Sequence, residues 1–254
     1  MHLNIFITVL STVVVAFLFA LFTTKKFQSR EQKRKTNMSN EEQRRPLKVR
    51  GATWSKNIAS YLSKKDITPN QISIASIFFS IIASIFILLI PSAISYQEIL
   101  FPILAAIFIQ MRLLCNLFDG MVALEGGKST KSGELYNDIP DRVSDSILFI
   151  ALGYSLTTFT FSIELGYLAA LFAMMTAYIR VLGSSMNAGA CFKGPMAKQH
   201  RMAILTFSLI FSIFESMIFE QNYILFIALL IITIGSFLTV VNRTFFIYKT
   251  LEGK

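Results

Sequence analysis

Residues 116–141 read NLFDGMVALEGGKSTKSGELYNDIPD, and this stretch joins the end of one apolar segment to the start of the next. It combines aspartates and asparagines with a glycine-rich turn. Burying a carboxylate at the centre of a bilayer costs about 2.5 kcal/mol or more. Acids kept at such a junction therefore indicate a chemical role, and the segments around them decide the fold.

The flanking sequence is apolar enough for a membrane protein. Apolar residues make up 54% of the 254 residues, and the mean hydropathy is +0.57. Seven runs approach the length of about 20 residues that spans a bilayer: 3–23, 71–95, 99–124, 143–161, 164–186, 202–219 and 222–248. Their recurrence excludes a soluble core. The sequence predicts an all-α integral-membrane six-helix bundle behind one additional N-terminal anchor.

The first run differs from a secretory signal peptide. Only His2 precedes it, and Lys25 and Lys26 follow it, whereas a signal peptide carries its positive charge in front. We therefore expect a transmembrane anchor at 1–24, a basic cytoplasmic linker at 25–50 and a membrane domain at 51–254.

The distribution of basic residues predicts the orientation. The loops near 90–100, 162–166 and 219–223 contain no lysine or arginine. The positive-inside rule places such loops outside and the basic loops in the cytoplasm. The polar junction would then face the cytoplasm, and we expect a bacterial inner (cytoplasmic) membrane protein.

The net charge of +9 does not indicate nucleic-acid binding. Ten of the basic residues fall within 25–50, directly after the first apolar run. A basic cluster beside a membrane span orients the protein and contacts anionic lipid headgroups. Membrane lipids, and no nucleic acid, are the expected partners of this cluster.

Residues 52–65 show the pattern of a helix lying in the membrane interface, with a plain surface helix as the alternative. One helical face carries Trp54, Ile58, Tyr61 and Leu62. After this segment, Thr68 can cap a helix and Pro69 suits a first helical turn. A spanning helix is therefore expected to begin there.

The segment GGKSTKSG at 126–133 resembles a phosphate-binding loop but lacks its spacing. A Walker A motif needs a glycine five residues before its Gly-Lys-Ser. Counted back from Gly127, that position is Val122. No buried parallel strand precedes it, so the phosphate-loop interpretation is rejected.

Helical spacing instead brings oxygen ligands together from both sides of the turn. One helix face carries Arg112, Asn116, Asp119 and Ala123, at i, i+4, i+7 and i+11. On the following helix, Asn137, Asp141 and Asp145 share a face, and Asp138 adjoins them. The connecting loop is short, so these two helix ends should face each other.

Oxygen ligands of this kind suit Mg²⁺ or Mn²⁺, which share their coordination with substrate phosphates. The expected metal ligands are Asn116, Asp119, Asn137, Asp138 and Asp141. The alternative is that the acids cap helices. Capping at a helix N-terminus explains Asp138 or Asp141, but it does not explain Asp119 near a C-terminal end, where the helix dipole disfavours an anion.

At these residues the sequence resembles the CDP-alcohol phosphatidyltransferase family, whose signature is D-x-x-D-G-x-x-A-R-x8-G-x3-D-x3-D. Every spacing is kept across Asn116, Asp119, Gly120, Ala123, Leu124, Gly133, Asn137 and Asp141. Asn116 and Asn137 replace aspartates, and Leu124 replaces the arginine. Each asparagine removes one negative charge, so a weaker second metal site, or help from Asp138, is expected.

The resemblance implies transfer of a phosphatidyl group from a CDP-linked lipid, such as CDP-diacylglycerol, to an alcohol, with release of CMP. Asp119 and Asp141 would be catalytic, with Asp141 taking the proton from the acceptor hydroxyl. Binding of CDP is expected at Asn70, Gly120, Ala123 and Gly133. A small alcohol or phosphorylated polyol would bind at Arg180, Lys198 and Arg201. A homodimer is also implied.

Two other functions are consistent with a membrane bundle. One is a non-catalytic lipid-binding relative of the family. The other is a cation-coupled transporter, which would place ionisable residues near the bilayer midplane. Here the acids gather at the cytoplasmic boundary instead, which favours the enzyme.

Overall fold

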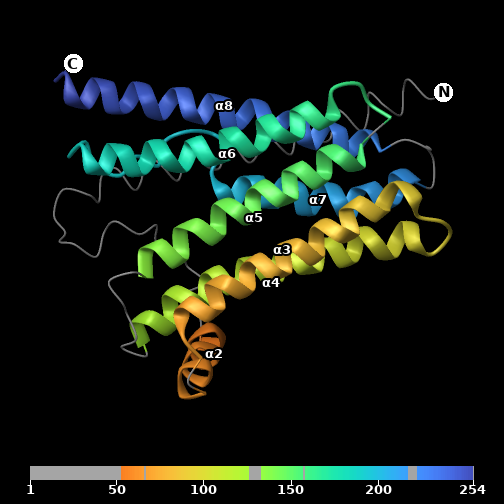
Figure 1. Ribbon diagram of the computed structural model, residues 1–254, viewed down its shortest axis with the longest axis horizontal. Coiled ribbons are helices and arrows are strands. Elements are labelled where there is room, and N and C mark those ends of the chain that lie inside the picture. The colour runs from red at the N-terminus through yellow and green to blue at the C-terminus, as the bar shows by residue number, and fades with distance from the viewer. Residues whose placement is uncertain (1–52, 66, 126–132, 157, 217–221, 254) are drawn as a thin grey trace.

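The computed structural model of the protein describes residues 53–65, 67–125, 133–156, 158–216 and 222–253. Within these ranges every regular element is a helix (Figure 1). The helices are α2 Thr53–Lys64, α3 Pro69–Leu89, the short 3₁₀ helix η3 Ile90–Ser92, α4 Gln97–Glu125, α5 Gly133–Ser155, α6 Ser162–Ser185, α7 Lys198–Ser216 and α8 Tyr223–Leu251. The predicted all-α fold is confirmed. The expected anchor 1–24 and linker 25–50 lie outside the described residues.

Helix α3 begins where the sequence places its start. The Thr68 hydroxyl accepts a hydrogen bond from the Gln71 backbone N–H at 3.3 Å, and the Gln71 side chain accepts one from the Thr68 N–H at 2.9 Å. This reciprocal pair is a capping box. Pro69 occupies the first helical position, where its missing N–H costs nothing.

Four of the described helices are long and apolar enough to cross a membrane: Pro69–Ser92, Gln97–Ala123, Ser162–Ser185 and Tyr223–Leu251. Helices α5 and α7, which lie near the runs expected at 143–161 and 202–219, do not meet the same criterion. Helix α5 carries charged side chains through its first half, and α7 begins with Lys198 and Arg201. These two helices supply the buried charged residues Asp145 and Arg201.

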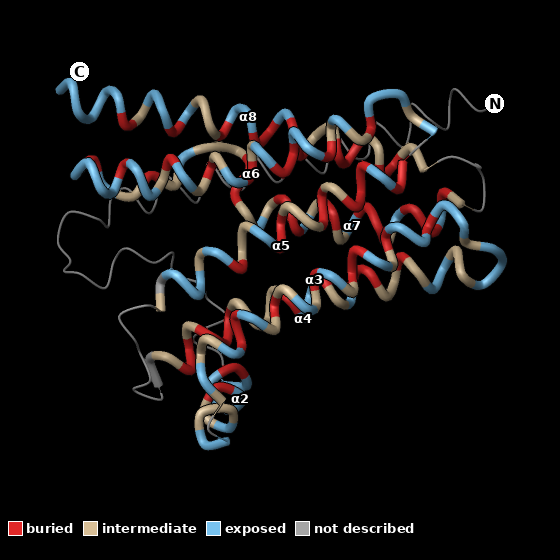
Figure 2. Tube along the Cα trace, viewed as in Figure 1, coloured by how far each residue is buried: buried red, intermediate tan, exposed pale blue. Residues whose placement is uncertain are grey.

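The six long helices α3 to α8 pack side by side, and successive helices run in opposite directions (Figure 1). Helix α3 packs on α4 and α5, α6 packs on α5 and α8, and α7 packs on α4 and α8. Buried positions line the contacts between helices in Figure 2. Apolar side chains such as Phe78, Phe207 and Phe245 are exposed on the outside, as lipid contact requires.

Helices α5 and α6 approach closely because two glycines face each other. A Cβ atom on Gly153 would lie 2.7 Å from the Ser162 carbonyl oxygen and 3.0 Å from the Gly166 Cα atom. Small residues at helix contacts allow the backbones of membrane helices to come together. This pair fixes α5, which carries part of the site, against α6.

Helix α2 lies across the ends of α3 and α4 rather than along the bundle (Figure 1). Ala59 is fully buried against an apolar cluster that contains Leu117 and Val122 of α4. On its other side, Trp54 and Tyr61 are 48% and 60% exposed. The helix thus has one face packed on the bundle and exposed aromatic side chains on the other, and its position in the membrane interface stays a prediction.

Candidate functional site

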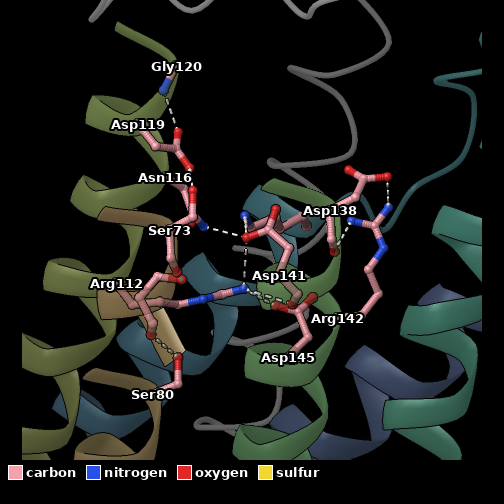
Figure 3. A network of polar contacts seen from close by, with 12 residues as sticks. Ser73, Ser80, Arg112, Asn116, Asp119, Gly120, Asp138, Asp141, Arg142 and Asp145 are labelled. Carbon is pink, nitrogen blue, oxygen red and sulfur yellow. Dashed lines mark hydrogen bonds and ion pairs between the residues drawn. The ribbon is translucent and has the colours of Figure 1, made fainter. Parts of the chain in front are cut away.

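The two halves of the predicted site meet across α4 and α5. The Asn116 side-chain amide donates a hydrogen bond of 2.6 Å to the Asp141 carboxylate. Asp119 lies one turn further along α4 on the same face, as Figure 3 shows. The spacing-based prediction that Asn116 faces Asp141 therefore agrees with the structure.

Asp119 is buried and held by two donors. Its carboxylate accepts a hydrogen bond of 2.7 Å from the Ser73 hydroxyl and one of 2.5 Å from the Gly120 backbone N–H. Sequence reasoning missed Ser73. It lies one helical turn after Pro69, on the α3 face that packs on α4. The sequence predicted where α3 begins, but it gave no other sign that Ser73 reaches the site.

Below these residues lies a buried ion network that joins three helices. Arg112 of α4 is fully buried and donates to the Asp145 carboxylate at 2.5 Å and to the Asp141 carbonyl oxygen at 3.2 Å. The second Asp145 oxygen accepts a hydrogen bond of 2.9 Å from Arg201 of α7. Each buried charge is thereby paired, as burial demands.

Arg201 was predicted to bind the acceptor, and the structure places it inside this network. It is 4% exposed, and it also donates to the Met196 carbonyl oxygen at 3.1 Å and to the Thr176 hydroxyl at 3.3 Å. These bonds hold the start of α7 against α5 and α6. The contacts of Arg201 are thus internal to the protein.

The segment before α7 is anchored from α8. Arg243 donates to the Lys193 carbonyl oxygen at 3.0 Å and also to the Thr176 carbonyl oxygen. The Met196 backbone N–H donates to the Thr239 hydroxyl at 2.8 Å. Together these contacts fix the point at which α7 begins.

Lys198 is the first residue of α7, and its ammonium group forms an ion pair with the Asp141 carboxylate. The Lys198 side chain is 27% exposed. It was predicted to bind the acceptor, and the structure brings it to the centre of the predicted metal site. Asp141 thus contacts both Lys198 and Asn116.

The two other predicted ligands have different surroundings. Asn137 is exposed. Asp138 pairs with Arg142 at 2.9 Å and with Arg180 at 3.5 Å, and Figure 3 shows Asp138 beside Arg142, on the side of Asp141 away from Asp119. Arg180, the third residue predicted to bind the acceptor, therefore lies beside Asp138.

The residues predicted to bind CDP border this polar end of the bundle. Asn70, Gly120, Ala123 and Gly133 are half-buried, near the start of α3, the end of α4 and the start of α5. The glycine-rich turn between α4 and α5 lies outside the described residues. In Figure 1 these helix ends point toward the same side of the molecule.

The side chains that meet here have donor groups suited to a hard divalent cation. Asp119 and Asp141 offer carboxylates, and Asn116 offers an amide carbonyl oxygen. The part of the chain that the structure describes contains no group of three or more His, Cys, Asp or Glu side chains able to hold a metal ion. Two carboxylates and one amide are the types of ligand that Mg²⁺ takes when it shares its coordination with substrate phosphates.

Comparison with known proteins agrees with this geometry. The profile of the CDP-alcohol phosphatidyltransferase family matches residues 66–241. An uncharacterized protein of Aquifex aeolicus (strain VF5) is 25% identical over 199 residues, which make up 78% of this chain and 90% of that relative.

Solved structures of phosphatidylinositol phosphate synthase from Mycobacterium tuberculosis share the fold. The structure in complex with manganese and citrate aligns with a TM-score of 0.63 at 18% identity, covering 76% of this chain and 88% of that one. The structure with CDP-DAG bound aligns with a TM-score of 0.62 at 19% identity, covering 78% and 94%. The family profile extends over most of the chain and includes the whole signature from Asn116 to Asp141. This chain, an integral membrane protein, therefore belongs to the CDP-alcohol phosphatidyltransferase family.

Proposed function

We propose that the protein transfers a phosphatidyl group from CDP-diacylglycerol to an alcohol and releases CMP, a step of phospholipid biosynthesis. The observation that carries this proposal is the 2.6 Å hydrogen bond between Asn116 and Asp141. These residues are the first and last positions of the family signature, and their contact closes the site across two helices. The CDP-DAG bound to the Mycobacterium tuberculosis synthase supports the choice of donor.

In this reaction the acceptor hydroxyl oxygen forms a bond to the phosphorus atom that carries the diacylglycerol. The bond between that phosphorus and the bridging oxygen of the pyrophosphate breaks, and CMP leaves with the electron pair. The hydroxyl proton moves to Asp141, the carboxylate proposed as general base. Asn116 and Arg112 hold that residue in place through its carboxylate and its backbone carbonyl oxygen.

Asp119, Asp141 and Asn116 are the residues proposed to hold a divalent ion, Mg²⁺ or Mn²⁺. When bound, such an ion neutralises the pyrophosphate and the charge that develops on the leaving phosphate. Ser73 and the Gly120 N–H keep the Asp119 carboxylate oriented at this position. Asp138, another predicted ligand, would need to release Arg142 and Arg180 in order to join them.

Charge near Asp138 supports an anionic acceptor such as a phosphorylated polyol. Arg142 and Arg180 both pair with this one half-exposed carboxylate, which leaves a positive charge to spare. Arginine suits phosphate because its planar group donates two parallel hydrogen bonds. We propose Arg180, together with Lys198, as the side chains that meet the acceptor.

The proposed setting is the inner membrane of a bacterium, with the site on the cytoplasmic face. The absence of lysine and arginine from the loops near 90–100, 162–166 and 219–223 supports this orientation. The helix ends that carry the site lie at the opposite end of the bundle from these loops. A homodimer is the assembly that the family resemblance implies.

Release of CMP tests the proposed function directly. Purified full-length protein would receive labelled CDP-diacylglycerol, Mn²⁺ or Mg²⁺ and a panel of alcohols, including phosphorylated polyols. Loss of a general base or of a positioned charge commonly costs 10²-fold to 10⁴-fold in rate. We therefore expect Asp141→Asn and Asp119→Asn to lower CMP release by about 100-fold or more.

The matched control is Glu164→Gln, which removes the same charge from an exposed side chain in the first turn of α6, at the other end of the bundle from the Asn116–Asp141 contact. It should lower the rate much less than the other two changes. If folded protein releases no CMP with any acceptor or metal, the catalytic proposal is wrong. Binding of CDP-diacylglycerol without release would then favour the non-catalytic lipid-binding relative, a reading that the two asparagines of the signature also favour.

A further inference from the structure

The Lys198 ammonium group lies where a cation would neutralise Asp141. It contacts the same carboxylate that accepts the Asn116 hydrogen bond, and Arg112 reaches that carboxylate from further away, at 3.7 Å. In the site proposed above, Asp141 would share a divalent ion with Asp119. The Lys198 ammonium group and that ion would therefore both bind the Asp141 carboxylate.

The formal charges explain why this chain can hold a lysine there. The charged cluster combines the carboxylates of Asp119, Asp141 and Asp145 with three cations, which are Arg112, Lys198 and Arg201. Negative and positive charges are equal in number. The family signature has two further aspartates, at the positions of Asn116 and Asn137. Without them, the cluster has no excess negative charge for a divalent ion to neutralise.

Among the three cations, Lys198 is the one that can leave. Arg112 and Arg201 are buried, and each donates to Asp145 and to a backbone carbonyl oxygen. Lys198 is partly exposed and is the first residue of its helix. Its ammonium group is carried on a flexible four-carbon side chain. Turning it away exposes an ammonium group able to pair with phosphate and uncovers the Asp141 carboxylate.

We infer that Lys198 and a divalent metal ion compete for the Asp141 carboxylate, so that metal binding requires Lys198 to turn away. The inference deepens the proposed function and rests on it for the identity of the site. According to this inference, Lys198 pairs with Asp141 when no metal is bound, which is a role in addition to the predicted binding of the acceptor. Its measurable consequence is a metal affinity held low by a side chain of the protein.

Mn²⁺ binding to the full-length protein, purified in detergent, tests the inference. The bound ion would be measured by electron paramagnetic resonance during titration with Mn²⁺, in the presence of a fixed concentration of CDP. We expect Lys198→Met to bind Mn²⁺ about fivefold more tightly than the unchanged protein, or more, which corresponds to about 1 kcal/mol or more for one released ion pair.

The matched control is Lys193→Met, because Lys193 is an exposed lysine in the segment just before α7. Its ammonium group lies 3.9 Å from the centre of the Phe246 ring. This change removes the same charge from the protein but leaves Lys198 on Asp141. Its Mn²⁺ affinity should stay within about twofold of the unchanged protein, since a charge on an exposed side chain is screened by solvent and salt.

Two further variants keep the test decisive if Lys198→Met folds poorly. Lys198→Arg retains the positive charge and should not tighten Mn²⁺ binding. In an Asp141→Asn background, Lys198→Met should lose its effect, because the shared carboxylate is gone. Equal or weaker binding by Lys198→Met, an equal gain from Lys193→Met, or no Mn²⁺ binding by any variant would overturn the inference.

The readout separates this inference from the proposed function. Tighter Mn²⁺ binding by Lys198→Met, in a protein that releases no CMP with any acceptor, would support the competition and overturn the proposed transfer. CMP release by the unchanged protein, together with an unchanged Mn²⁺ affinity in Lys198→Met, would support the proposed transfer and overturn the competition.

Discussion

Asp145 is the residue whose charge connects α4, α5 and α7. Its two oxygens receive Arg112 and Arg201, and all three side chains are buried. Breaking a buried ion pair by removing one partner costs about 3–5 kcal/mol, because the remaining charge is left unpaired. We expect Asp145→Asn to lower the stability of the purified protein by an amount of this order, measured as a fall in the thermal unfolding midpoint.

The comparison variant for this change is Asp138→Asn, which removes a charge from a half-exposed carboxylate paired with Arg142. Exposed ion pairs contribute about 0–1 kcal/mol, so its unfolding midpoint should move little. Equal shifts for the two variants would mean that the Asp145 network does not support the bundle.

Helical spacing was sufficient to place several site residues from the sequence. Arg112, Asn116 and Asp119 repeat at helical intervals, and the contacts of Arg112 and Asn116 with α5 follow that prediction. Ser73 and Lys198 reach the same site from α3 and α7, and no spacing within one helix relates them to Asp141. Their positions depend on how separate helices pack, and a single sequence does not encode that packing as a local pattern.

The segment between α6 and α7 is the element whose position decides where Lys198 lies. Residues 186–197 contain no long helix, and Arg243 of α8 donates to the Lys193 and Thr176 carbonyl oxygens. An arginine that satisfies buried carbonyl groups leaves them unpaired when it is removed. We expect Arg243→Met to speed backbone hydrogen exchange across 186–197 by about tenfold or more, the ratio that a loss of about 1.4 kcal/mol of local stability produces.

Exchange measured by mass spectrometry after digestion would locate the effect. Arg142→Met serves as the control, since Arg142 pairs with Asp138 at the start of α5 and contacts no part of that segment in the described hydrogen bonds and ion pairs. Unchanged exchange at 186–197 in Arg243→Met would show that other contacts, such as Met196 with Thr239, hold the segment by themselves.

For the molecule as a whole, hydropathy predicted the class of fold better than it predicted the character of each helix. The all-α membrane bundle is confirmed, and four described helices qualify as spans by length and composition. Helix α5 falls short because charged side chains fill its first half, and α7 falls short because polar and charged residues lie at both of its ends. A hydropathy count cannot tell a lipid-facing helix from one whose charges are paired inside the protein, as those of Asp145 and Arg201 are.

The apolar and aromatic side chains on α2 predict that this helix lies in the membrane interface. Trp54 is the single tryptophan in the sequence, so its fluorescence reports on α2 alone. Its ring is 48% exposed and contacts Phe118 of α4 edge-on, with the ring centroids 6.2 Å apart. Tryptophan prefers the headgroup region of a bilayer. We expect lipids that carry a quencher near the headgroup to reduce its emission more than lipids quenched near the chain ends.

A deep reference comes from a Trp54→Phe, Ile81→Trp double variant, because Ile81 is exposed midway along α3. The order of the two lipid quenchers should reverse for that tryptophan, which faces the hydrocarbon. If Trp54 instead responds to iodide in water and to neither lipid, α2 lies off the membrane. The helix would then be a surface helix, and the polar ends of α3 to α5 would open directly to water rather than to the headgroup layer where a CDP-linked lipid presents its pyrophosphate.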